Sequence, residues 1–495
     1  MRRAAKAVVA AASCLAGVGA LGLLGPAPTL PGNANAAVVP GHGAASSTAP
    51  GTGGAPLMKT PLLSPGRLPL TLQDLWAERN LASSLGKAMS PSALGASAAG
   101  SSCAEVAQGG QVLYAHGAGL RVLPASNMKL LTATALLDKL GPGYTFKTTV
   151  LAAAGPVSGV VDGNLYLVGG GDPLLRTPSY VSSVQYSGPV YTNVDDLVAL
   201  LEAAGVRQVT GSVLADESRY DSVRYVASWP ASYAEQGDVG PLSAVGINDG
   251  TATAPSLVPT GDPPPVQSAG VLTQLLEQAG VGVGGAPGEG SPPAGATVLA
   301  RLVSPPLKLI LGEVLRESDN TAMELMTKEL GLKELGSGTT AAGTAAVRAD
   351  LKADGFPLKG FVNVDGSGLS RVDRVTCGLL LAALERSGPT GVLVRDLPVA
   401  GESGTLTDEL NGTVAAGRVL AKTGSLNGVK ALSGWALPVN GEAPGNPGLS
   451  SPVVFSLVLN GLPLSVANPA LLTDRVAVDV AEYPQAPALG AFEPG

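Results

Sequence analysis

The sequence predicts an α+β fold with one antiparallel sheet that is flanked by helices and interrupted by a large inserted domain. A hairpin-like pair of strands stands near the start of the folded part, and three strands with a closing helix stand near its end. Helical segments fill much of the interval, so the two ends can share one sheet with helices packed on it. Between Phe146 and Ser304, short strands and Gly/Pro-rich loops replace the helical pattern, which predicts the insertion.

The first 36 residues have the pattern of a secretory signal peptide. Two arginines and a lysine precede an apolar run over 7–24, and Ala34-Asn35-Ala36 is a small-residue cleavage site. An uncleaved membrane anchor is the alternative interpretation of this run. No other stretch is long and apolar enough to span a membrane. We therefore expect an exported protein, extracellular or on the wall side of the membrane, with no transmembrane segment after cleavage.

The rest of the chain divides by composition. Small residues and prolines dominate residues 37–66, which cannot bury a core and are predicted to be a disordered linker. The predicted order is then a first part of the main domain at 67–145, an inserted domain at 146–300, the second part of the main domain at 301–485, and a tail at 486–495.

Periodicity and turn residues predict the elements in order. The main domain begins with a helix over 71–85, a hairpin of 102–106 with 111–115 around Gln108-Gly109-Gly110, and a helix from Met128 that Gly141-Pro142 ends. The insertion holds strands at 150–151, 159–161, 164–168 and 209–215, and helices at 195–204 and 267–279. Beyond it come helices at 307–315, 321–330 and 377–384, a strand entering a loop at 361–371, strands at 418–424, 429–437 and 453–459, and a helix at 469–483.

Charge and histidine content exclude several classes of protein. The net charge of -7, with no basic run, argues against a nucleic-acid partner. The chain has only 2 histidines, His42 and His116, so a three-histidine metal site is excluded. A Ser-His-Asp triad would have to use His116, but no G-x-S-x-G turn accompanies it, and a surface or turn histidine is the better interpretation.

The predicted mature chain keeps two cysteines, Cys103 and Cys377. In an exported protein such a pair can form a disulfide, and two buried free thiols are the alternative. The sequence leaves both open.

The first chemical motif is Ser126-x-x-Lys129, at the start of a predicted helix. A spacing of three places the lysine amine one turn from the hydroxyl, on the same helix face. A serine is a weak nucleophile without a base, and a lysine can be that base only if burial or a second cation lowers its pKa. The motif alone is weak, because Ser84 and Lys87 have the same spacing, and Ser126 could instead be a helix cap.

Two further motifs follow in order. Ser318-x-Asn320 interrupts two predicted helices, and Lys422-Thr423-Gly424 ends a predicted strand. Each has an ordinary structural interpretation as a cap, a strand-end charge or a turn, and Ser425-Leu426-Asn427 also fits the S-x-N spacing. The ordered set is specific, because each motif lies on the kind of element that catalysis by such a set requires.

These motifs resemble those of the serine penicillin-recognising enzymes, and within them the low-molecular-mass class C penicillin-binding proteins, the D-alanyl-D-alanine carboxypeptidase/endopeptidase family. The resemblance covers about 70–485. It extends to Gly169-Gly170-Gly171-Asp172-Pro173, to the segment from Asp365 to Arg371, and to Ser403-Gly404-Thr405-Leu406. It implies a β-lactamase/transpeptidase-like sheet in a penicillin-binding domain, with an insertion after the first motif as in that family.

The resemblance also implies roles for single residues. Ser126 would attack the carbonyl of the penultimate D-alanine, and Lys129 would accept the hydroxyl proton. Ser318 would pass a proton to the departing D-alanine, and Asn320 would hold Lys129 and the substrate amide.

The third motif would bind substrate. Lys422 would supply the second cation and bind the terminal carboxylate together with Thr423, while Gly424 would leave room along the strand edge. The backbone N–H groups of Ser126 and Ser425 would form an oxyanion hole.

The implied substrates are peptidoglycan stem peptides, with β-lactams as inhibitors and no metal or organic cofactor. A β-lactamase-like hydrolase is one alternative, but no E-x-x-x-N segment lies between Asn320 and Lys422. A non-catalytic wall-binding scaffold is the other, and the intact motifs argue against it.

Overall fold

The computed structural model describes residues 70–185, 188–250, 261–438, 451–465 and 468–484. The predicted signal peptide, linker and tail, at 1–36, 37–66 and 486–495, lie outside these residues, as does His42. Within the described part, no helix combines the length and apolar character needed to cross a membrane.

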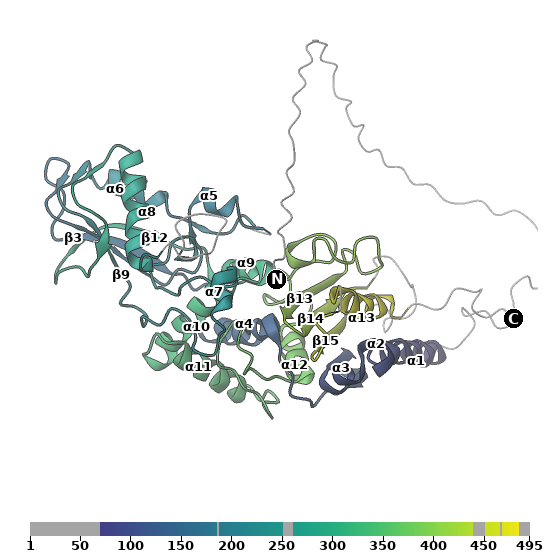
Figure 1. Cartoon of the computed structure of the whole chain (residues 1–495). Helices are drawn as coiled ribbons and strands as arrows, with labels where there is room; N and C mark the ends of the chain where they lie inside the picture. Colours follow the sequence, from purple (N-terminus) through teal and green to yellow (C-terminus); the bar gives the residue numbers. More distant parts are fainter. Residues whose placement is uncertain (1–69, 186–187, 251–260, 439–450, 466–467, 485–495) are drawn as a thin grey trace, which may run out of the picture. The chain divides into compact units, whose positions relative to one another are not determined.

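The main sheet joins the two ends of the described chain, as the sequence predicts. Its five strands have the order β13-β14-β15-β1-β2, and every neighbouring pair is antiparallel. Figure 1 labels three of these strands, β13, β14 and β15. Their bounds are β1 Cys103–Gln108, β2 Gln111–His116, β13 Val419–Leu426, β14 Val429–Ala436 and β15 Val453–Leu459. Since β1 pairs with β15, the N-terminal hairpin extends the C-terminal meander into a single sheet.

Helices cover both faces of this sheet. Side chains of the central strand, β15, point alternately to the two faces and join a separate apolar cluster on each. On β15, Val454 and Val458 join one apolar cluster, and Phe455 and Leu457 join the other. The first cluster contains residues of α4 Met128–Lys139, α9 Leu307–Glu317, α10 Asn320–Leu335, α11 Thr340–Ala353 and α12 Cys377–Ser387. The second contains residues of α1 Leu70–Ala88, α2 Pro91–Leu94, α3 Ala96–Ser101 and α13 Ala470–Glu482.

The segment between the first two motifs builds sheets of its own. Its larger sheet has the order β11-β9-β5-β3-β12, and a smaller one has the order β10-β8-β4. The strands are β3 Lys147–Ala152, β4 Val160–Val161, β5 Leu165–Val168, β6 Leu175–Arg176, β7 Thr192–Asn193, β8 Gln208–Val209, β9 Val213–Asp216, β10 Gly282–Val283, β11 Gly288–Glu289 and β12 Thr297–Val303. The helices are α5 Pro178–Val181, α6 Asp196–Ala203, α7 Ser232–Gln236 and α8 Pro264–Gln278.

We propose that residues 146–300 and the end of β12 form the inserted domain. A separate apolar cluster, built from these strands with α6 and α8, supports this proposal. The first and last strands, β3 and β12, pair with each other in antiparallel register from Lys147↔Val303 to Ala152↔Thr297. The chain therefore enters and leaves the insertion at neighbouring positions.

The structure differs from the sequence-based expectation at several elements, including many of the short helices and strands. Residues 361–364 do not form a strand, since only an isolated bridge joins Val362 to Arg374. Helix α11 was not expected, because its alanines and threonines leave few large apolar residues to mark a helical face. Strand β12 was not expected either, because it directly precedes the Ser304-Pro305-Pro306 helix start.

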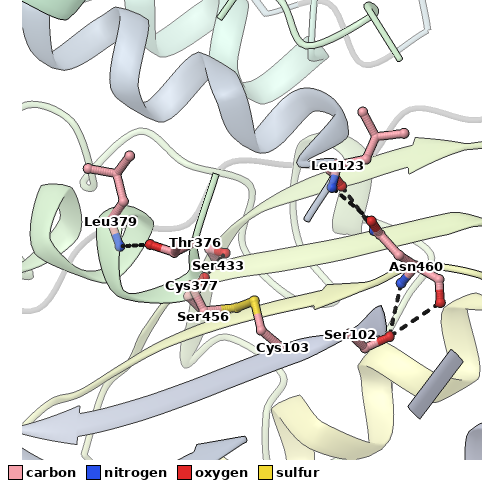
Figure 2. The surroundings of a disulfide bond; sticks show 9 residues. All are labelled: Ser102, Cys103, Leu123, Thr376, Cys377, Leu379, Ser433, Ser456 and Asn460. Carbon is pink, nitrogen blue, oxygen red and sulfur yellow. Dashed lines mark hydrogen bonds between the residues drawn. A yellow bond between two sulfur atoms is a disulfide. The ribbon is translucent and has the colours of Figure 1, made fainter. Parts of the chain in front are cut away.

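Cys103 and Cys377 form a disulfide, which confirms the pairing that the sequence left open (Figure 2). The bond joins the first residue of β1 to the first residue of α12, where the Thr376 hydroxyl caps the helix by accepting from the N–H of Leu379. It therefore ties the N-terminal strand to a helix that follows the insertion.

Replacing both cysteines by serine should lower the free energy of unfolding by about 2 to 5 kcal/mol, because the bond closes a long loop in the unfolded chain. The two cysteines are separated by 274 positions. Urea unfolding of the oxidised wild type and of the double variant measures the difference, with reduced wild type as the control. An unchanged unfolding midpoint would contradict the expectation.

Candidate active site

Ser126 lies in a tight turn immediately before α4. Residues Ala125–Asn127 form one 3-10 turn, and α4 continues from Met128. Ala125 has φ 48°, a left-handed conformation that costs a non-glycine residue roughly 1–2 kcal/mol. Such strain persists only where the surroundings fix the backbone, and here the turn leaves Ser126 half-exposed among buried neighbours.

The amine of Lys129 connects the first motif to the second. Its Nζ lies 3.0 Å from Ser126 Oγ, 2.5 Å from Asn320 Oδ1 and 2.9 Å from the backbone oxygen of Ser367. The last two atoms can only accept hydrogen bonds. A neutral amine would therefore direct its two N–H bonds to them and its lone pair to the serine hydroxyl.

Burial allows the Lys129 amine to lose its proton near physiological pH. The side chain is 0% exposed, and burial lowers its pKa to about 8, against the opposing charges of Asp365, Glu324 and Asp319. The sequence-based expectation named both burial and Lys422 as causes, and burial is the main cause in the structure.

The second motif occupies the break between α9 and α10. Ser318 ends α9 with φ 62° and ψ 31°, and Asp319 caps α10 by accepting from the N–H of Ala322. Asn320 begins α10, and its Nδ2 donates to the backbone oxygen of Asp238, 2.7 Å away. Its amide group thus bridges Lys129 and a residue of the proposed insertion.

The third motif lies on β13, against the turn that carries Ser126. Asn127 Nδ2 donates to the backbone oxygen of Lys422 at 3.2 Å. A Cβ at Gly424 would lie 3.0 Å from Asn127 Nδ2 and 3.1 Å from the backbone oxygen of Pro124, so a larger residue would require these atoms to shift. Gly424 thus makes room for the nucleophile turn.

The two side chains before Gly424 differ in environment. Lys422 is 0% exposed, donates to the Thr423 carbonyl, and has a pKa that burial and the charge of Lys129 hold well below its ordinary value. The Thr423 hydroxyl is half-exposed and shares a hydrogen bond of 2.7 Å with the Thr405 hydroxyl.

A cavity of about 320 Å³ unites residues of all three motifs. Its lining consists of Ser126, Ser318, Asn320, Thr405, Glu409, Thr423, Gly424, Ser425, Lys430, Ala431, Leu432, Ala470 and Thr473. The cavity therefore presents a hydroxyl nucleophile beside hydroxyl, amide and charged groups, with two buried lysines next to it. Such an arrangement can perform acyl transfer to serine.

The alternative candidates do not join this group. Ser84 lies within helix α1 and the exposed Lys87 lies in its last turn, and neither lines the cavity. His116 ends β2, where its Nε2 is 3.0 Å from the backbone oxygen of Ala99. Ser84, Lys87 and His116 are therefore not assigned a role as nucleophile or base at this site.

Residues 365–368 support Lys129 through contacts that motif spacing does not predict. Glu324 Oε1 accepts from the N–H groups of Gly366 and Ser367, and this places the Ser367 carbonyl on the lysine. A Cβ at Gly368, which has φ 85°, would lie 1.9 Å from the Ala125 carbonyl. The glycines of this loop were the available signal, but their partners are distant in sequence.

Comparison with known proteins agrees with this geometry. The model of the D-Ala-D-Ala carboxypeptidase 3 (S13) family matches residues 81–270 and 262–483, and the chain belongs to this family. It is similar to the D-alanyl-D-alanine carboxypeptidase of Actinomadura sp. (strain R39), with 32% identity over 76% of this chain and 79% of that protein. It is also similar to carboxypeptidase DacB of Mycolicibacterium smegmatis, with 31% identity over 75% of this chain and 76% of that protein.

A solved structure shares the fold. The crystal structure of penicillin binding protein 4 (dacB) from Haemophilus influenzae aligns with a TM-score of 0.64 and 20% identity, over 80% of this chain and 98% of that one. The expected α+β architecture with its antiparallel sheet is therefore confirmed.

Proposed function

We propose that this protein is a serine D-Ala-D-Ala carboxypeptidase that trims peptidoglycan stem peptides and is acylated by β-lactams. The observation that carries the proposal is the contact of the buried Lys129 amine with Ser126 Oγ at 3.0 Å, inside a cavity that the other two motifs also line. Membership of the carboxypeptidase family supports the choice of substrate.

Acylation begins at Ser126. Neutral Lys129 takes the hydroxyl proton while Asn320 and the Ser367 carbonyl hold the amine in place. The Ser126 oxygen attacks the carbonyl of the penultimate D-alanine, and the N–H groups of Ser126 and Ser425 stabilise the oxyanion. The proton that Lys129 has taken then passes through the Ser318 hydroxyl to the D-alanine nitrogen as the C–N bond breaks, and water later hydrolyses the ester.

The third motif recognises the end of the substrate. The half-exposed Thr423 hydroxyl binds the terminal carboxylate, and the buried Lys422 amine lies next to it, on the Thr423 carbonyl. A β-lactam presents an amide beside a carboxylate, so the same groups bind it. The H. influenzae penicillin binding protein 4 has been solved with a β-lactam, which supports this assignment.

Endopeptidase action on cross-linked peptides is a second activity of the same site. Its leaving group is larger than D-alanine, and the cavity of about 320 Å³ extends beyond Thr423 to Glu409 and Thr473.

We also propose that the protein acts outside the membrane. N-terminal sequencing of the secreted protein should then give a first residue at or near Ala37.

Incubation of the enzyme with a peptide that ends in D-Ala-D-Ala, and with a fluorescent penicillin, tests the function. We expect D-alanine release and a long-lived adduct on Ser126. Rapid loss of the adduct with repeated turnover of penicillin would favour a β-lactamase. Absence of both adduct and release would favour a wall-binding scaffold.

A further inference from the structure

Arg176 of the proposed insertion contacts both residues that flank Ser318. Its Nη1 lies 3.2 Å from Glu317 Oε2, and its Nη2 lies 2.5 Å from Asp319 Oδ2. Glu317 is the last residue of α9, and Asp319 caps α10. One planar guanidinium therefore fixes both sides of the break that carries the second motif.

The backbone at this break needs such a support. Ser318 adopts the left-handed conformation, which a non-glycine residue keeps only where its surroundings hold it. A shift there would move Ser318 in the cavity and Asn320 against Lys129. The position of the second motif is thus sensitive to its flanking carboxylates.

The insertion holds Arg176 firmly. The residue is 1% exposed, its Nη2 also lies 3.4 Å from Asp249 Oδ2, and its guanidinium carbon lies 5.6 Å from the centre of the Tyr180 ring. The Tyr180 hydroxyl donates to the same Asp249 oxygen at 2.5 Å. Arg176, Tyr180 and Asp249 come from β6, α5 and the turn Asn248–Gly250, all within the proposed insertion.

The charges of Arg176 and its carboxylate partners also affect the amine of Lys129. Three buried carboxylates surround one guanidinium, and burial raises the pKa of Asp319 to about 6 while Arg176 opposes the rise. The charge of Asp319 in turn raises the pKa of Lys129. Loss of the guanidinium would therefore alter both the geometry and the charge next to the base.

We propose that Arg176 is a positioning residue that sets the place of Ser318 and Asn320, so that the insertion forms part of the catalytic apparatus. This inference rests on the proposed function, because it assigns Arg176 an effect on acylation of Ser126. Arg176 acts through the turn, and it is not among the residues that line the cavity holding Ser126.

The test compares Arg176→Lys and Arg176→Met with a matched control, Arg219→Met. Arg219 of the insertion also binds a buried carboxylate of α10, with its Nη2 2.6 Å from Glu329 Oε1, but this contact lies away from the second motif. Thermal unfolding reports stability, and penicillin acylation at saturating and limiting concentrations separates the rate of the chemical step from binding.

We expect Arg176→Lys to recover most of the melting temperature lost in Arg176→Met, since the charge is retained. Its maximal acylation rate should stay on the order of tenfold to a hundredfold below that of wild type, because one ammonium does not reproduce the fork between two carboxylates. Arg219→Met should lower the melting temperature and leave the acylation rate unchanged.

Wild-type acylation by either Arg176 variant would overturn the proposal. An equal loss of acylation in Arg219→Met would overturn it too, because any weakened contact of the insertion would then suffice. A wild-type enzyme without a penicilloyl adduct would instead refute the proposed function, so the two failures are distinguishable.

Discussion

Ser126→Ala should abolish penicillin acylation and D-alanine release together. Both reactions need an oxygen at this position to form the ester, and the neighbouring half-exposed hydroxyl of Ser318 has no amine bonded to it in the described structure. Removal of a catalytic nucleophile typically lowers turnover by at least about a thousandfold. Intact-protein mass spectrometry measures the adduct, and an assay for free D-alanine measures release.

The matched control is Ser84→Ala. Ser84 and Lys87 repeat the spacing of the first motif on α1, but they lie outside the cavity of Ser126. This variant should keep wild-type acylation and release. A penicilloyl adduct mapped to Ser84, or a stable adduct on the Ser126→Ala protein, would contradict the assignment of the nucleophile.

The sequence predicts side chains of the site better than it predicts backbone partners. Ser126 lies in the 3-10 turn that leads directly into α4, three residues before Lys129, so their contact follows from local geometry. Asn320 reaches the same amine because its motif interrupts two helices. The carbonyl groups of Ser367 and Asp238 complete the network, but a backbone oxygen carries no sequence signal.

Fold prediction has a similar limit. The strand patterns at both ends of the folded part predict that the ends can share one sheet, but they do not predict that β1 pairs with β15. Helix α11 gives no such signal, because Ala346, Val347 and Leu351 supply most of its apolar contacts. The position of Arg176 against the second motif depends on tertiary packing and could not be predicted from spacing.

Lys129→Arg should nearly abolish acylation although it preserves a positive charge. The proposed mechanism requires a neutral amine, and an arginine does not release its proton at working pH. The wild-type lysine can do so, since burial lowers its pKa to about 8. The measurement is the acylation rate over pH 6 to 10, together with circular dichroism to establish that the variant is folded. Wild-type acylation by folded Lys129→Arg would remove lysine from the role of base.

The pH dependence of the wild-type acylation rate also tests the role of Lys129 as the base. Because the neutral form is active, acylation should rise with pH and level off above about 8, where Lys129 has lost its proton. Glu324→Gln should move the upper part of this rise to lower pH, since ionised Glu324 raises the pKa of Lys129 and burial raises the pKa of Glu324 itself to about 8. Glutamine can still accept from the N–H groups of Gly366 and Ser367 through one oxygen, so the Ser367 carbonyl stays on the amine. A profile that falls with pH, or a Glu324→Gln profile displaced to higher pH, would show that another group is the base.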